Sequence, residues 1–162
     1  MIYITGDCHG EFHKFSVENF IEQKEMTKDD YVIICGDFGG IWNKDEESRW
    51  EKWWMDWLEE KPFTTLFVDG NHENFDRLYA YPVEEWNGGK VHQISDNIFH
   101  LMRGQIFEID GLKIFTMGGG ESSDIDIRRD VNAWSKDELP TQEELLEGAE
   151  NLEVAGYDID II

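Results

Sequence analysis

Two residues near the start of the chain, Asp7 and His9, have the side chains and the spacing of a metal-ligand pair. They follow an apolar run, residues 1–6, that is typical of a short buried strand. The run ends in glycine, so the pair falls in the loop at the strand's carboxyl end. In an extended loop, residues two apart project to the same side, and the carboxylate and imidazole can face one divalent cation. This motif alone is short and common.

Two later loops repeat the arrangement. Residues 31–35 and 64–68 are again short apolar runs, and each ends in glycine with polar residues beside it. Strands that alternate with helices predict a parallel sheet covered on both faces, with the functional residues at the carboxyl ends of the strands. We therefore expect five residues to lie close together in space: Asp7, His9, Asp37, Asn71 and His72.

Such a set of ligands suits a hydrolase with two metal ions, which together bind phosphate and generate hydroxide from water. Asp7 and His9 would bind the first metal, and Asp37, on the central loop, would bridge the two. Asn71 would offer a neutral amide oxygen to the second metal. Mixed oxygen and nitrogen ligands favour Mn, Fe, Zn or Ni over Ca or Mg. His72 would protonate the leaving oxygen as a general acid.

The elements that position these loops include two predicted helices, residues 12–23 and 46–60. Four tryptophans at helical spacing form an apolar stripe on the second helix: Trp50, Trp53, Trp54 and Trp57. Burial against the sheet is the common use of this spacing, and a surface that stacks on a ligand is the alternative. Trp42 is different, because it lies in a glycine-rich loop and could line the substrate cleft.

The second half of the chain predicts antiparallel or mixed strands at 91–94, 98–101, 105–109 and 112–117. Asp110-Gly111 indicates a hairpin between the last two. His92 and His100 read as ordinary strand histidines rather than ligands. The glycines at 118–120 indicate either a close approach of the backbone or a simple turn. A helix follows at about 141–150, capped by Thr141 with Glu144, and residues 156–162 read as a further strand.

Composition limits the class of protein. The 162 residues fit one domain, 40% of them are hydrophobic, and the formal charge is −22. Such a surface repels phosphate backbones, which argues against nonspecific nucleic-acid binding. The sequence shows no membrane span and no signal-like start, so a cytoplasmic location and no membrane partner are predicted. Cys8 and Cys35 make no disulfide framework and are interpreted as packed residues.

Asp7-x-His9, Gly36-Asp37 and 70–73 (Gly-Asn-His-Glu), in this order and each after a strand, resemble the calcineurin-like metallophosphoesterases. The resemblance implies an α/β fold, a four-layer αββα sandwich of two mixed sheets, with phosphoester hydrolysis at a binuclear metal centre. It implies the same ligand roles as above. Gly118-Gly119 and the stretch containing Arg129, Trp134 and Glu138 resemble a bacterial branch of this family, with less specific motifs.

The chain departs from the family in one respect. The family supplies further histidines after a later strand and in a Gly-His-x-His turn, and this sequence has neither. We therefore expect a metallophosphoesterase domain over residues 1–162 that is incomplete at its C-terminus. The complete enzyme would hold two divalent metal ions, whereas this chain would hold one or none. Weak or absent phosphatase activity is the corresponding prediction.

Two alternatives come from other functional classes. One is a non-catalytic scaffold that keeps the fold for protein binding, and the other is a metal- or nucleotide-binding module without hydrolysis. For the enzyme, Trp42 and Arg129 are candidate substrate contacts, although Arg129 also suits a surface ion pair. The sequence leaves open the physiological phosphoester, mono- or diesterase activity, the metal and the oligomeric state.

Overall fold

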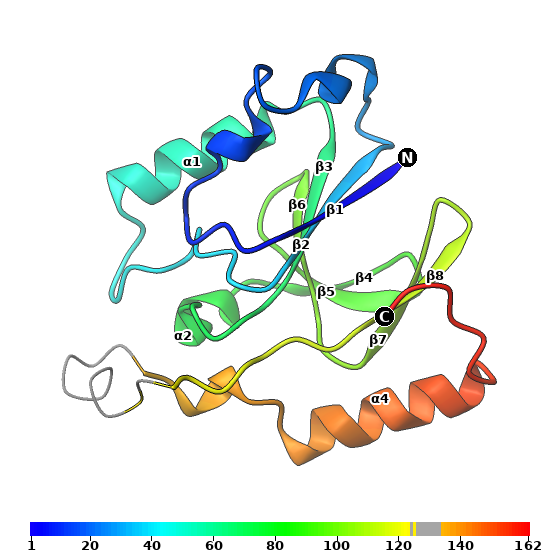
Figure 1. The fold of residues 1–162 in the computed structure, drawn as a ribbon. Coiled ribbons are helices and arrows are strands. Elements are labelled where there is room, and N and C mark those ends of the chain that lie inside the picture. The colour runs from blue at the N-terminus through cyan, green and yellow to red at the C-terminus, as the bar shows by residue number, and fades with distance from the viewer. Residues whose placement is uncertain (124, 126–133) are drawn as a thin grey trace.

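The computed structural model describes residues 1–123, 125 and 134–162, and its centre is a six-stranded mixed sheet (Figure 1). The strand order is β1-β2-β3-β6-β5-β4. In chain order the strands are β1 (Ile2–Gly6), β2 (Tyr31–Cys35), β3 (Thr64–Val68), β4 (Val83–Trp86), β5 (Gly89–Gln93) and β6 (Ile98–Leu101). The first three pair in parallel, as do β3 and β6. Strand β5 pairs antiparallel with both β4 and β6. The loops that follow β1, β2 and β3 therefore lie at one edge.

A second sheet covers one face of the first. It consists of the antiparallel strands β7 (Gln105–Ile109) and β8 (Leu112–Thr116), joined by the predicted Asp110-Gly111 turn with positive φ at both residues. Ile161 adds an isolated parallel bridge to β8. Of the strand expected at 156–162, only this residue forms a bridge, and the carboxylates of Asp158 and Asp160 accept from Lys113 beside it.

Successive side chains of a strand point to opposite faces of the sheet, so each face of the six-stranded sheet has its own core. Val32 and Ile34 of β2 face a cluster that contains Trp54 and Leu58 of α1 (Arg49–Glu59). Ile33, between them, points to the opposite face and joins a cluster with residues of β7 and β8. Figure 1 shows α1 outside the first core and α4 (Gln142–Val154) outside the second sheet. The layers are thus helix, sheet, sheet and helix, which confirms the predicted α/β sandwich.

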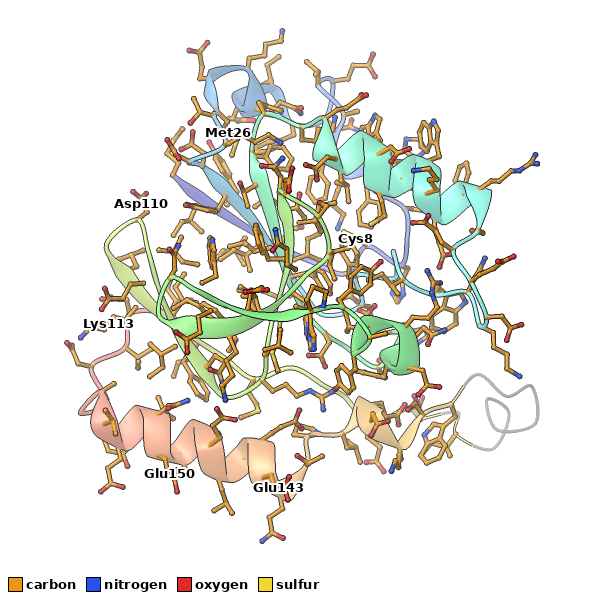
Figure 2. The ribbon with its side chains drawn as sticks, turned by 180° about the vertical axis from the view of Figure 1, so that it is seen from behind. Cys8, Met26, Asp110, Lys113, Glu143 and Glu150 are labelled. Carbon is orange, nitrogen blue, oxygen red and sulfur yellow. The ribbon has the colours of Figure 1, made fainter. Side chains whose placement is uncertain are left out.

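The two long helices begin at capping boxes. Thr141 accepts from the Glu144 amide, as predicted, and Ser48 does the same with Glu51 at the start of α1. Figure 2 shows Glu143 and Glu150 of α4 pointing away from the sheets, as expected for a solvated acidic face. In the described part of the chain, no helix combines the length and the apolar character required to cross a membrane.

The prediction of a helix at residues 12–23 is wrong. The segment forms two short 3-10 helices, His13–Phe15 and Ile21–Glu25, separated by extended backbone at Ser16. The side-chain amide of Gln23 donates to the carbonyls of Phe15 and Phe20. Side chains that bond to nearby carbonyls in this way compete with the ladder of an α-helix. The short helix α2 (Phe75–Leu78) and strand β4 were not predicted.

Candidate metal centre

Three of the predicted ligands form a cluster at the carboxyl edge of the parallel strands. Asp7, His9 and Asp37 each offer one ligand atom, and these atoms lie within 4.8 Å of one another. His9 Nε2 is 3.7 Å from Asp7 Oδ2 and 3.8 Å from Asp37 Oδ2. Two carboxylates and an imidazole facing one point are a donor set that suits a transition-metal ion or Zn²⁺. In the described chain, the arrangement therefore fits the divalent metal predicted from the sequence.

The loops after β1 and β2 are fastened to each other by their backbones. The amides of Cys8 and His9 both donate to the Asp37 carbonyl, at 3.0 and 2.8 Å. His9 and Asp37 have φ of 50° and 43°, in the left-handed region that few residues other than glycine adopt. Unfavourable backbone of this kind persists only where the surroundings fix it, and it concentrates at functional sites. The two ligands are thus held in place before any ion binds.

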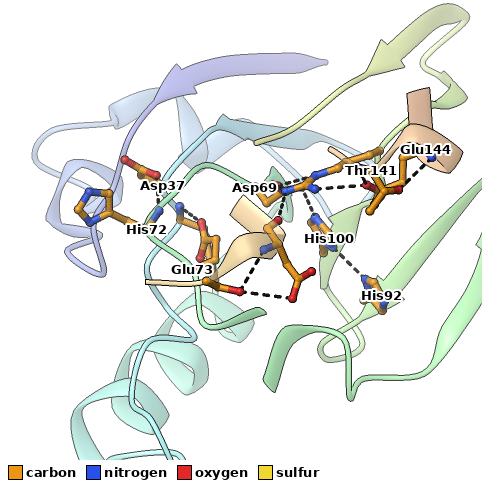
Figure 3. A network of polar contacts seen from close by, with 12 residues as sticks. Asp37, Asp69, His72, Glu73, His92, His100, Thr141 and Glu144 are labelled. Atoms are coloured by element: carbon orange, nitrogen blue, oxygen red, sulfur yellow. Dashed lines mark hydrogen bonds and ion pairs between the residues drawn. The ribbon is translucent and has the colours of Figure 1, made fainter. Parts of the chain in front are cut away.

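The loop after β3 joins the same network through His72 and Glu73. The His72 amide donates to Asp37 Oδ1 at 2.9 Å, which leaves Oδ2 directed at the cluster. Glu73 is buried and accepts from the amides of Phe38 and Gly39 at 2.6 and 3.1 Å (Figure 3). Burial raises the pKa of Glu73 well above its usual range, and the two amides oppose this only in part. Glu73 thereby ties the second and third loops together.

Asn71 is held from the other side of its loop. Its Nδ2 donates to Ser122 Oγ at 3.0 Å, and Ser122 donates in turn to the buried carboxylate of Glu138 at 2.6 Å. Of the two interpretations left open for the glycines at 118–120, the close approach holds for Gly118 and Gly119, since a Cβ there would lie 2.3 Å from Asp69 Oδ1 and 2.7 Å from the Glu138 carbonyl oxygen. The segment after β8 therefore orients the amide of Asn71.

A second buried polar network lies directly behind the β3 loop, and the sequence did not reveal it. Asp69, whose side chain is fully buried, accepts from Arg103 Nε and Nη2 at 3.0 and 2.6 Å and contacts His100 Nε2 at 3.0 Å. His100 Nδ1 contacts His92 Nδ1 at 2.9 Å (Figure 3). Burial raises the pKa of Asp69, but His100 and Arg103 outweigh it and lower the pKa overall. Both histidines lie in strands as expected, His92 in β5 and His100 in β6, and the ligand cluster found among the described residues contains neither.

The His92–His100 contact predicts a loss of stability in acid. Burial and the neighbouring His100 lower the pKa of His92 from 6.5 to about 4. The folded-state pKa lies below the unfolded one, so this histidine contributes stability that is present above pH 6.5 and is lost as the pH falls towards 4. Since one pKa unit is about 1.4 kcal/mol, lowering the pKa from 6.5 to about 4 contributes at most about 3–4 kcal/mol.

We expect His92→Asn to weaken this dependence, because the amide can replace the bond to His100 but does not titrate. Urea unfolding at pH 7 and pH 4.5 should show a smaller loss in free energy for the variant than for the wild type. His13→Asn, at an exposed histidine, is the matched control and should behave as the wild type. Equal losses in all three proteins would contradict the prediction.

A cleft of about 250 Å³ opens beside the cluster, with His9 and His72 in its lining. Trp42 also lines it and stacks on His72, with ring centroids 5.7 Å apart and planes 18° from parallel.

The predicted burial of the four tryptophans on α1 is confirmed only in part. Trp54 is buried, but the prediction was wrong for Trp50 and Trp53, which are 58% and 47% exposed. Helical spacing shows which side of the helix faces the core, whereas the number of side chains on that side that become buried depends on how far the sheet extends beneath the helix. Arg129 lies outside the described residues.

Cys8 and Cys35 are free thiols, and neither belongs to the ligand cluster found among the described residues. Burial raises the pKa of Cys8 to about 11, and burial also raises that of Cys35. A thiol with a raised pKa is a poor nucleophile and a poor metal ligand at neutral pH. Cys8 is buried in the first core, in agreement with a packing role, whereas Cys35 is exposed at the end of β2, so its interpretation as a packed residue is wrong.

Comparisons with known proteins agree with this geometry. A family model described as calcineurin-like phosphoesterase matches residues 1–162. Lariat debranching enzyme A of Xenopus laevis is 28% identical over 130 residues, which cover 73% of this chain and 23% of the relative. The lariat debranching enzyme of Caenorhabditis briggsae is 29% identical, with coverage of 73% and 24%. The chain thus spans about a quarter of the length of these relatives. No solved structure matches it significantly.

Proposed function

Because this chain belongs to the calcineurin-like phosphoesterase family, we propose that it is a metal-dependent phosphoester hydrolase with its reaction centre at Asp7, His9 and Asp37. One observation carries the proposal: three ligand atoms from two strand-end loops lie within 4.8 Å of one another. A bound divalent ion would supply Lewis acidity toward the phosphate and lower the pKa of a water molecule. Mn, Fe, Zn and Ni suit these ligands best.

Each loop has a distinct role in the proposal. Asp7 and His9 would hold one ion and Asp37 would be the shared ligand, since its Oδ2 is directed at His9 while its Oδ1 accepts from the His72 amide. Asn71, oriented by Ser122, would serve a second ion. Of the five histidines in the chain, His13, His92 and His100 lie outside the cluster found among the described residues. We therefore propose that residues 1–162 bind metal incompletely on their own and turn over slowly.

His72 is the proposed general acid. Its amide is fixed by Asp37, and its ring lies between two aromatic neighbours, stacked on Trp42 and edge-on to His9 with a centroid distance of 5.1 Å. Such packing fixes the direction in which the ring can deliver a proton to the leaving oxygen. Trp42 and Arg129 remain proposed substrate contacts.

The substrate is proposed to be a small phosphoester rather than a nucleic-acid polymer. The curated relatives are named for debranching lariats, but the formal charge of −22 on this chain opposes the approach of a polyanion. A cytoplasmic location also remains a proposal. The second candidate function is the non-catalytic scaffold, which would require no metal.

Metal titration by calorimetry separates these functions. With Mn²⁺ or Zn²⁺, we expect the wild-type chain to bind at least one ion and Asp37→Asn to bind much more weakly, because the variant loses one of two carboxylates. Asp56→Asn is the matched control, since Asp56 is an exposed partner of Lys52 on α1. One weak site favours the incomplete centre and two tight sites a complete one. Absence of binding to the wild type would support the scaffold instead.

His72→Gln tests the role of the general acid. We expect turnover of an alkyl phosphoester to fall by about 100-fold, within the range for loss of such a group, while the metal affinity stays near that of the wild type. His13→Gln, an exposed histidine outside the cluster, is the control. A smaller effect with a 4-nitrophenyl ester, whose leaving oxygen needs no proton, would support the assignment. Equal effects on both esters would contradict it.

A further inference from the structure

The cleft beside the metal-ligand cluster has two tryptophans that the core does not need. Trp42 and Trp50 both line it, and they are 40% and 58% exposed. Trp54, the third tryptophan of the lining, is fully buried and belongs to the core. Large exposed aromatic rings that gather at a concave site mark a binding surface more often than chance exposure does.

The loop that carries Trp42 is anchored to the helix that carries Trp50. Glu51 is buried, and it accepts from the amides of Trp42 and Asn43 at 2.6 and 2.7 Å and from that of Ser48 at 2.7 Å. Arg77 also binds it at 3.0 Å. Burial raises the pKa of Glu51, but these donors together lower it. The carboxylate of Glu51 thereby fixes the backbone segment that carries Trp42 to the helix that carries Trp50.

Each of the two rings is stacked on a second aromatic ring. Trp42 stacks on His72, which is fixed to Asp37 through its amide. Trp50 stacks on Trp53, with centroids 5.6 Å apart and planes 16° from parallel. Rings that are held in this way lose little further entropy when a ligand binds. The cleft is therefore organised before binding.

The size and charge of the cleft restrict the ligand. Its volume of about 250 Å³ is below the range of roughly 300–1,000 Å³ for sites of drug-sized ligands, so one ring system fits better than a longer chain. Among the residues that the structure describes, the charged side chains that line it are acidic, Glu11 and Glu51, and none is a lysine or an arginine. The lining therefore opposes a di- or triphosphate and favours an uncharged planar ring.

We propose that Trp42 and Trp50 form a subsite for one planar aromatic ring attached to the phosphoester, a nucleobase or an aryl group. The proposal rests on the proposed function, because His9 and His72 at one end of the cleft belong to the reaction centre. Because His72 lines the same cleft, a ring bound there would place the ester oxygen near the proposed acid. The subsite names the substrate class: phosphomonoesters or small diesters of nucleosides or of aryl alcohols.

Binding measurements with matched ligands test the subsite. In calorimetry with the Mn²⁺-loaded chain we expect adenosine 5′-monophosphate and phenyl phosphate to bind about tenfold or more tightly than glycerol 1-phosphate, the size of effect seen for a stacked base. Trp42→Ala and Trp50→Ala should each remove most of this preference, and Trp42→Phe should keep much of it. Tyr157→Ala is the control, since Tyr157 is an exposed aromatic residue that does not line the cleft.

The outcomes separate this proposal from the proposed function. Equal affinities for the three ligands in a chain that binds Mn²⁺ would overturn the subsite and leave the hydrolase intact. A ring preference that depends on Trp42 but is unaffected by Mn²⁺, in a chain without hydrolytic activity, would support the subsite and contradict the hydrolase. Tighter binding of the nucleotide than of phenyl phosphate would identify the ring as a nucleobase. Loss of the preference in Tyr157→Ala alone would contradict the assignment to Trp42 and Trp50.

Discussion

The Arg103→Met variant is expected to unfold with a free energy about 3–5 kcal/mol lower than that of the wild-type chain. Arg103 and Asp69 are a buried ion pair, with side chains 2% and 0% exposed. Two nitrogens of the guanidinium bind one carboxylate oxygen, and Nη2 also donates to the Asp137 carbonyl at 2.8 Å. Methionine fills much of the volume but leaves the carboxylate with His100 as its remaining charged or ionisable partner in the network.

A double-mutant cycle shows whether the loss comes from the unpaired charge. We expect Arg103→Met combined with Asp69→Asn to be less destabilised than the sum of the single variants, because the amide carries no charge to be left unpaired. Arg49→Met, at an exposed arginine in the first turn of α1, should change the free energy by about 0.5 kcal/mol or less. Urea unfolding measures all four. Additive single effects would contradict the ion-pair explanation.

The pH dependence supplies a second check. The paired Asp69 has a lowered pKa, so the wild type has a stabilising contribution above the unfolded-state pKa that is lost as the pH falls through the folded-state value. Arg103→Met removes one of the two groups that lower this pKa. The difference in stability between wild type and variant should therefore shrink in acid. A difference that is constant from pH 7 to acid would indicate that packing, rather than charge, accounts for the loss.

The strands and their ends could be predicted from local pattern. Runs such as 31–35 and 64–68 are apolar, short and followed by glycine, so both their bounds and the polar residues beyond them followed directly. The parallel pairing of these strands then placed Asp7, His9 and Asp37 together, because carboxyl ends of parallel strands share an edge. This part of the site needed no knowledge of side-chain contacts.

The residues that fix the loops of the site in place could not be predicted from local sequence pattern. Asp69 lies just before Gly70 at the end of β3, and nothing in the local sequence shows that its side chain turns to Arg103, which lies 34 positions later in the chain. Glu73 carries no local sign that it will accept two amides from the β2 loop. Contacts between loops distant in sequence depend on register and on side-chain direction, and one sequence does not fix either. The same limit applies to Trp50, whose exposure depends on where the sheet ends beneath α1.

The Gly70→Ala variant is expected to lose metal affinity by about 100-fold, the upper end for changes next to metal ligands. A Cβ at this position would lie 2.1 Å from Asp37 Oδ1 and 2.4 Å from the Asp37 amide nitrogen. Neither atom can yield freely, because the Asp37 carbonyl binds the amides of Cys8 and His9 while Oδ1 binds that of His72. The methyl group must therefore separate the loop of the proposed bridging ligand from that of the proposed acid.

Gly6→Ala is the matched control for this substitution. Gly6 ends β1 at the same edge of the sheet, and a Cβ there would meet no atom within 4 Å. Calorimetry with Mn²⁺ should show near wild-type affinity for Gly6→Ala and the large loss for Gly70→Ala, and circular dichroism should show that both variants are folded. Overpacking of this kind costs about 1–3 kcal/mol, which urea unfolding would detect for Gly70→Ala alone. Unchanged metal affinity in a folded Gly70→Ala protein would mean that the Asp37 carboxylate does not bind the ion.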